Sequence, residues 1–289
     1  MGFFLVIKAE LVRTFIVLRR YWFATLTSII IGYGMLMVLI VGFMARRDEV
    51  TEMMGARFGV DPERATNAAL GFIIGMFAFG IIGIFSQGLQ AMAQSGQLEQ
   101  LCLSPHGLVT NFLGRSLVGA VSAVLSSTIL LLMITATVGG TLHFNPLITG
   151  VLLALTYANL IGFGFMVGGL VLVFKQTGQI AVLIRMALLF LAFAVSDKVD
   201  TGYKLIDALM HAAPITDAAI CLKFVLIRDQ MVRQFDEGGA VVAQHFQSVF
   251  TLPSFYFLLL SCVVWTTLGI AVFKAMENHS RDKGTLGAY

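Results

Sequence analysis

The chain has 289 residues, of which 58% are apolar and only 12% carry a charge. Soluble domains carry about 25% charged residues, so this composition excludes a water-facing surface and with it a soluble enzyme. The mean hydropathy of +0.88 indicates a protein whose solvent is lipid. The net charge of +3 is small and spread along the chain, so no nucleic-acid partner is expected.

The first twenty residues predict an amphipathic helix at the membrane surface. Apolar side chains recur every three or four positions along one face, namely Phe4, Ile7, Leu11, Phe15 and Leu18. The other face carries polar and charged residues, namely Glu10, Arg13, Thr14 and Arg20. We expect the apolar side to lie among lipid headgroups and the charged side to face the cytoplasm. Both charge signs are present, which favours a docking surface for a cytosolic partner over a simple membrane anchor.

Six apolar stretches, with no more than one charged residue each, are long enough to cross a bilayer core of about 30 Å, which needs about 20 apolar residues per helix. The predicted spans are residues 23–43, 67–86, 114–138, 147–174, 178–196 and 254–273. The third and fourth spans share one long apolar run, which Gly139-Gly140-Thr141 and Asn145-Pro146 divide by a turn. Residues 1–289 therefore form a single transmembrane domain.

Six spans place both termini on one side of the membrane. Lys8, Arg13, Arg19 and Arg20 precede the first span, so the positive-inside rule predicts cytoplasmic termini in a multi-pass protein of the inner (cytoplasmic) membrane. The large outer loop is then residues 197–253, which mixes apolar runs with charges. We expect helices there that lie at the outer surface or dip into it, with a plain surface cap as the alternative.

The sequence lacks the motifs of several common catalytic and metal-binding sites. The Gly-Lys pair of a P-loop never occurs, and neither metalloprotease nor serine-hydrolase motifs are present, so we expect no catalytic residues and no enzyme. Cys102, Cys221 and Cys262 lie far apart, which predicts neither a disulfide framework nor a metal site. The six predicted cores contain no Asp, Glu or His, which disfavours transport driven by an ion gradient.

Arg185 is the one ionisable residue well inside a predicted span. Counted from a helix start near Thr177 at 1.5 Å per residue, it lies about 12 Å deep. Its side chain has three possible roles: snorkelling to the membrane surface, an interhelical contact with a carbonyl group, or binding of an anionic substrate. Two G-x-x-x-G pairs, Gly71/Gly75 and Gly164/Gly168, predict close helix packing, either within the subunit or along a dimer seam.

The segment between the second and third spans predicts a short helix over about residues 96–106 at the cytoplasmic surface. Leu98, Leu101 and Cys102 repeat at helical spacing, Gly96 can open the turn, and Pro105 ends the helix. This segment resembles the coupling helix of type-2 permeases of ABC transporters, which runs approximately Gly-Thr-Leu-Glu-x-Leu-x-x-Ser-Pro. The matching residues are Gly96, Leu98, Glu99, Leu101, Ser104 and Pro105. Gln97 differs, because threonine is usual at that position.

The resemblance extends along the whole chain. The amphipathic start is similar to that family's connecting helix, and the six spans with a larger loop before the last are similar to its core. Ala213-Pro214-Ile215-Thr216 is similar to an Asn-Pro-hydrophobic-Thr motif after the fifth helix, with alanine in place of asparagine. The ending Gly284-Thr285-Leu286-Gly287-Ala288-Tyr289 is similar to a tail common in bacterial members.

The resemblance implies an all-α integral membrane protein with six transmembrane helices after an amphipathic interfacial helix, the type-2 exporter architecture. It also implies an ABC ATPase subunit as partner, which binds ATP and Mg, and a second permease copy or paralogue; this chain itself binds no cofactor. The connecting-helix contacts with the ATPase would be Glu10, Arg13 and Arg20.

The substrate path implied by the resemblance lies between the two permeases and is lined by the first, second and fifth spans. The candidate residues are Phe72, Phe77, Phe79, Arg185, Met186, Phe190 and Phe193, although plain packing is the alternative for the apolar ones. The expected cargo is hydrophobic or amphipathic (a drug, a lipid-like molecule or a peptide), with lipid or polysaccharide carriers left open. A gradient-driven secondary transporter or a channel is the alternative function.

Overall fold

Helices make up most of the computed structural model, which describes residues 2–44, 62–102, 107–173, 178–195, 199, 202–235 and 241–282. The α-helices in these ranges are α1 (Gly2–Arg20), α2 (Trp22–Met44), α3 (Pro62–Gln94), α4 (Gln97–Cys102), α5 (Gly107–Val138), α6 (Pro146–Val173), α7 (Gly178–Ala194), α8 (Lys204–Ala212), α9 (Thr216–Leu226) and α10 (Pro253–Asp282). Strands β1 (Met231–Phe235) and β2 (Val241–Phe246) form an antiparallel hairpin, and a 3₁₀ turn, Val249–Thr251, leads into α10.

Five of the described helices, α2, α3, α5, α6 and α10, are long and apolar enough to cross a membrane. This agrees with the predicted multi-pass helical membrane protein. Several of these helices extend beyond the predicted spans, in part because charged residues occur near their ends. α3 begins before Glu63 and Arg64, and α10 continues beyond Lys274 and Glu277.

The predicted fifth span, residues 178–196, corresponds to α7, which has only 17 residues. At 1.5 Å per residue α7 is about 25 Å long, which is less than the hydrocarbon thickness of about 30 Å. α8 and α9 form a second irregular element, because their axes meet at a bend of 81°. Together α8 and α9 have the composition of a broken span or a re-entrant loop.

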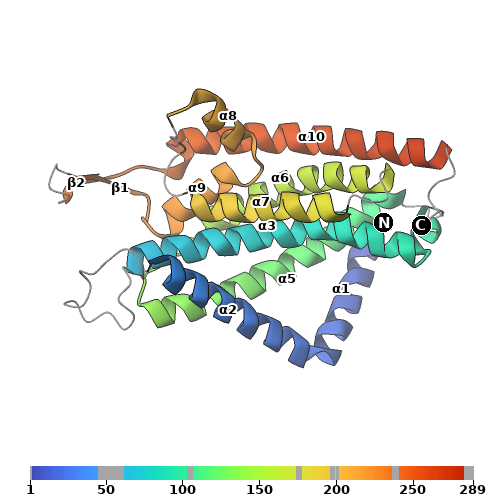
Figure 1. Cartoon of the computed structure of the whole chain (residues 1–289), viewed down its shortest axis with the longest axis horizontal. Coiled ribbons are helices and arrows are strands. Elements are labelled where there is room, and N and C mark those ends of the chain that lie inside the picture. The colour runs from blue at the N-terminus through green and yellow to red at the C-terminus, as the bar shows by residue number, and fades with distance from the viewer. Residues whose placement is uncertain are drawn as a thin grey trace.

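α3 is the central helix of the bundle and contacts α5, α6 and α7, while α6 packs along α10 (Figure 1). α2, α3, α5, α6 and α7 alternate in direction, and α10 runs parallel to α6. The start of α2 and the end of α10 therefore lie toward the same end of the bundle as α4. We call this end the α4 end and the opposite one, where β1 and β2 project, the hairpin end. α1 runs across the bundle direction, as expected for an interfacial helix.

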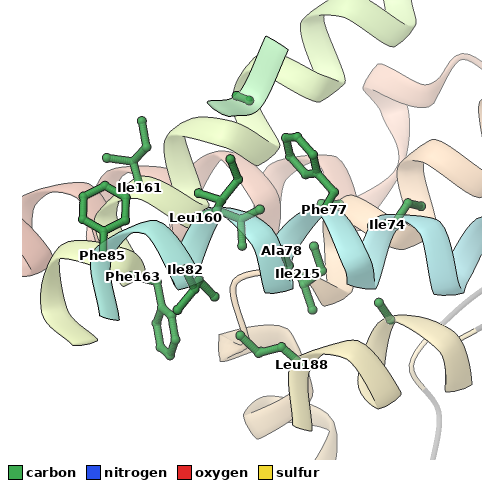
Figure 2. Close-up of a cluster of buried hydrophobic side chains, with 14 of the residues drawn as sticks. Ile74, Phe77, Ala78, Ile82, Phe85, Leu160, Ile161, Phe163, Leu188 and Ile215 are labelled. Atoms are coloured by element: carbon green, nitrogen blue, oxygen red, sulfur yellow. The ribbon is translucent and has the colours of Figure 1, made fainter. Parts of the chain in front are cut away.

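Buried apolar side chains join α3 to α6 and α7, including Phe77 and Phe85, Leu160 and Leu188 (Figure 2). The Phe85 ring lies 4.6 Å from the Phe165 ring, centroid to centroid, which ties α3 to α6. Such aromatic contacts stabilise the core beyond the area that they bury.

Glycines allow the closest helix crossings. A Cβ atom on Gly269 of α10 would lie 1.8 Å from the carbonyl oxygen of Gly162 on α6, so no side chain fits there. The two G-x-x-x-G pairs also pack within the subunit. A Cβ on Gly71 would lie 2.6 Å from the carbonyl oxygen of Ala192 on α7, and one on Gly164 would lie 2.6 Å from the Phe85 ring. The structure therefore shows packing within the subunit at both glycine pairs.

The described part of the predicted outer loop, residues 197–253, contains helices as expected, but β1 and β2 were not predicted. Every residue of α9 is buried, whereas none of α8 is. The chain leaves α9 through Asp229 and Gln230, both at positive φ, and then turns into β1. Gln230 fixes this turn because its Oε1 accepts a hydrogen bond of 3.1 Å from the backbone N–H of Val249.

Candidate functional sites at the α4 end and between the helices

α4 is a six-residue helix held against α3 and α5. Gly96 adopts a φ of +70° directly before it, a left-handed conformation that glycine adopts without steric cost. Leu98 is fully buried, and Leu101 packs partly against the core, while Gln97 and Gln100 are exposed. The helix is therefore anchored by one face and presents an amide-bearing face outward.

The structure brings four of the six predicted coupling residues into one short segment. Gly96 precedes α4, and Leu98, Glu99 and Leu101 belong to it. Ser104 and Pro105 lie outside the described residues, as does the predicted tail motif, residues 284–289. Gly107, which sequence reasoning did not single out, starts α5 with a φ of +67°.

α1 packs on α5, a contact that the sequence did not predict. The Val6 side chain of α1 lies against Gly114 of α5. A Cβ atom on Gly114 would lie 2.7 Å from the Cγ1 atom of Val6. Glu10 and Thr14, expected on the cytoplasmic face, are partly buried, whereas Phe15 of the apolar face is 67% exposed. Glu10 and Thr14 therefore lie beside the contact with α5, while most of the predicted apolar face stays exposed.

The three predicted connecting-helix contacts have different surroundings. Glu10 pairs with Arg13 at 3.2 Å, and both interact electrostatically with Arg115 of α5. The Arg13 side chain is 58% exposed. Arg20 is also exposed, and its guanidinium carbon lies 5.8 Å from the centroid of the Tyr21 ring. Arg13 and Arg20 are thus accessible at the surface. Glu10 is partly buried and interacts with two arginines of the same chain, Arg13 and Arg115.

Arg185 ties α7 to α3. Its Nε donates a hydrogen bond of 2.8 Å to the carbonyl oxygen of Phe79, and its guanidinium carbon lies 3.6 Å from the centroid of the Phe79 ring. Gly83 leaves the room for it, since a Cβ there would lie 2.6 Å from Nη2. Arg185 is 4% exposed, and its Nη1 has no hydrogen-bond partner within the described residues. Of the alternatives left open by the sequence, the interhelical carbonyl contact is present.

The remaining substrate-path candidates divide into two groups. Phe72 and Phe77 are buried, and Phe79 and Phe193 are partly buried beside the cluster that contains Phe72. Met186 and Phe190 point away from the rest of the chain, with exposed fractions of 42% and 58%. The candidates therefore do not line a common cavity within this subunit.

Sequence reasoning missed Lys223, which lies in α9 and is 3% exposed. Its ammonium group donates hydrogen bonds to the carbonyl oxygens of Ala192, at 3.2 Å, and of Val195, at the end of α7. A cation in this place satisfies terminal carbonyl groups and interacts favourably with the helix dipole. The available signal was a lone lysine within the apolar run Ile215 to Leu226.

A second missed feature is an acid and a histidine at the bend between α8 and α9. His211 Nδ1 lies 2.8 Å from Asp217 Oδ1, and the imidazole stacks on the Phe257 ring at 4.5 Å between centroids. Asp217 is 2% exposed. The predicted Ala213-Pro214-Ile215-Thr216 motif forms this bend, where Asn159 of α6 donates a hydrogen bond of 2.9 Å to the carbonyl oxygen of Pro214.

No three His, Cys, Asp or Glu side chains gather into a metal-binding group in the ranges that the structure describes. No protein-family model matches the chain, and no curated protein matches it. The functional argument therefore rests on the residues and contacts given above.

Proposed function

We propose that this chain is the membrane-spanning permease subunit of an ATP-driven ABC exporter of type 2, and that a separate ATPase subunit binds at its α4 end. The observation that carries the proposal is α4 itself. Its Leu-Glu-x-Leu pattern, its entry through a left-handed glycine and its exposed Gln97 and Gln100 suit a short helix that inserts into a partner.

The anchoring of α4 supports a mechanical role. Leu98 is buried and α4 contacts both α3 and α5, so a displacement of α4 acts on two long helices directly. α1 also packs on α5, which gives a second element through which the partner can act. ATP drives such a switch only because the closed ATPases prefer one arrangement of the permease over the other.

The outward stripe of α7 supports a path between two permease copies. Its exposed side chains recur every three or four positions, namely Ile180, Leu183, Met186 and Phe190. Two of these, Met186 and Phe190, are predicted path residues. In the proposed dimer this stripe faces the cargo, which is hydrophobic or amphipathic because the stripe carries no charge. The α4 end then lies in the cytoplasm and the hairpin end outside.

A gradient-driven transporter is the second candidate, and one observation favours it. At the hairpin end, within the predicted outer loop, Asp217 and Lys223 are buried and His211 is partly buried beside Asp217. Intramembrane groups of this kind carry protons in many carriers.

One experiment separates the two candidates. The tagged full chain is purified from its native membrane, the proteins that come with it are identified, and the chain is reconstituted in proteoliposomes with and without them. We expect a P-loop ATPase to copurify, and flux of an amphipathic dye to require it together with ATP. Flux by the chain alone, driven by a pH gradient, would establish the second candidate instead.

A further inference from the structure

A cavity of 530 Å³ lies among α3, α5, α6 and α9, at the hairpin end of the bundle. Its volume is within the range of about 300–1,000 Å³ found for small-molecule sites. The wall is formed mainly by apolar side chains, including Ile73 and Phe77, Leu131, Leu153 and Leu222. Of the predicted path residues, only Phe77 belongs to this wall.

One hydroxyl group on the wall is unsatisfied. Thr128 and Thr156 donate their hydroxyl protons to carbonyl oxygens of their own helices, Val124 at 2.8 Å and Leu152 at 2.7 Å. Thr149 is different. It is 4% exposed, and its Oγ1 has no hydrogen-bond partner in the described part of the chain. A buried hydroxyl without a partner costs free energy, which a bound group could recover.

The charges on the wall restrict the chemistry of an occupant. None of the described residues that line the cavity is Asp, Glu, Lys, Arg or His. An ionised group would therefore be buried without a counter-charge, which is strongly unfavourable. An alcohol, ester or amide group meets no such penalty and can bond to Thr149.

The edge of the cavity indicates how an occupant enters. Leu132 and Phe144 both line it, yet they are 59% and 70% exposed on the outside of the bundle. Leu132 lies on the spanning helix α5, where an exposed apolar side chain faces lipid, and Phe144 lies in the connection between α5 and α6. The cavity is therefore reached from the bilayer beside Leu132.

We propose that this cavity binds an apolar chain bearing one uncharged hydrogen-bonding group, with that group at Thr149. The acyl-ester part of a bilayer lipid and a free neutral amphiphile share this chemistry. The site lies within one subunit and does not depend on an ATPase partner, so it goes beyond the proposed exporter function.

Gly150 offers a way to fill the cavity. It lines the wall, and a Cβ built on it meets no atom within 4 Å, so a side chain can begin there without a clash. Gly80 on α3 is the matched control, because its Cβ position is equally open but it does not line the cavity. Both substitutions, Gly150→Leu and Gly80→Leu, replace a helical glycine and add the same side chain.

The test uses the full chain in nanodiscs of phosphatidylethanolamine and phosphatidylglycerol with two photoreactive probes. One is a diazirine-bearing oleyl alcohol and the other is phosphatidylethanolamine with a diazirine on its acyl chain, and labelled peptides are mapped by mass spectrometry. We expect label to concentrate on α5 and α6 near Leu131 and Leu153. Gly150→Leu should reduce it at least tenfold, and Gly80→Leu should leave it unchanged.

Thr149→Val provides the second variant, because it keeps the shape and removes only the hydroxyl. It should weaken labelling by the alcohol about fivefold and leave a hydrocarbon probe of equal length unaffected. Cavity labelling by the phospholipid probe identifies a bilayer lipid as occupant, and labelling by the alcohol alone identifies a free amphiphile. Label spread evenly over lipid-facing residues, and unchanged in Gly150→Leu, would overturn the proposal.

Discussion

The Nε of Arg185 donates a hydrogen bond of 2.8 Å to the carbonyl oxygen of Phe79, and the same guanidinium lies over the Phe79 ring. One residue of α3 therefore holds the cation by its backbone and by its side chain. This relationship joins the short helix α7 to the centre of the bundle.

Replacing Arg185 by methionine should weaken this joint without unfolding the chain. Methionine retains most of the aliphatic length but loses the hydrogen bond and the cation–π contact, which together contribute about 1–3 kcal/mol. We expect Arg185→Met to lower the midpoint of thermal unfolding in detergent and to leave transport of a neutral cargo nearly intact. Leu268→Met, on an exposed face of α10 outside the predicted path, is the control. A loss beyond tenfold confined to an anionic cargo, at equal folded amounts, would indicate an anion-binding role.

The crossing of α6 and α10 is expected to tolerate no added methyl group. Gly269→Ala would place a Cβ 1.8 Å from the carbonyl oxygen of Gly162, so the two helices must separate. We expect the free energy of unfolding to fall by about 3 kcal/mol or more, or folding to fail altogether. Gly34→Ala on α2 is the matched control, because its Cβ meets no atom within 4 Å.

Gly34→Ala should raise stability by about 0.5–1 kcal/mol, since alanine favours a helix more than glycine does. Size-exclusion profiles and thermal unfolding of both variants measure the difference. Equal stability of Gly269→Ala and Gly34→Ala would show that the crossing is looser than described.

The sequence predicted the long helices well because charge-free runs and lipid-spanning helices share one physical cause, the cost of charge in hydrocarbon. The absence of charge did not predict two other features, the ends of the helices and the β-hairpin. α3 begins at Pro62 and α10 ends at Asp282, so each includes charged residues, such as Glu63 and Glu277, that lie outside its charge-free run. The hairpin strands are only 5 and 6 residues long, and neither alternates apolar and polar residues, so the period-two signal of a strand is absent.

The functional sites were less predictable, because they depend on contacts between distant segments. A count of charges in spans found Arg185 but not its partner Phe79, which lies 106 positions away. Lys223 was overlooked because the run around it is apolar on average. The contact between α1 and α5 was not predicted, because hydrophobic periodicity does not show which neighbouring helix a surface helix contacts. The cavity beside Thr149 could not be predicted from the sequence, because its wall is formed mainly by residues of four helices, α3, α5, α6 and α9.

The His211–Asp217 contact should behave as a coupled pair. Replacing His211 by phenylalanine leaves the buried Asp217 without this partner, a change that costs about 3–5 kcal/mol when the acid stays charged. Asp217→Asn removes the charge and should cost much less. The double variant should then be no less stable than His211→Phe alone. Additive losses, measured by urea unfolding at pH 7, would show that the two side chains act independently.

The proposed coupling role of α4 predicts the effect of reversing the charge at Glu99. Glu99→Arg leaves the buried anchor Leu98 in place, so the chain should insert and fold normally. A positive group in the contact should nevertheless weaken binding of the ATPase, because like or mismatched charges across an interface cost several kcal/mol. We expect the permease-stimulated ATP hydrolysis of the reconstituted complex to fall at least tenfold.

Lys204→Glu is the control, since it reverses an exposed charge on α8 at the hairpin end. Full stimulation by Glu99→Arg would remove α4 from the coupling contact, and equal losses in both variants would point to a general charge effect instead.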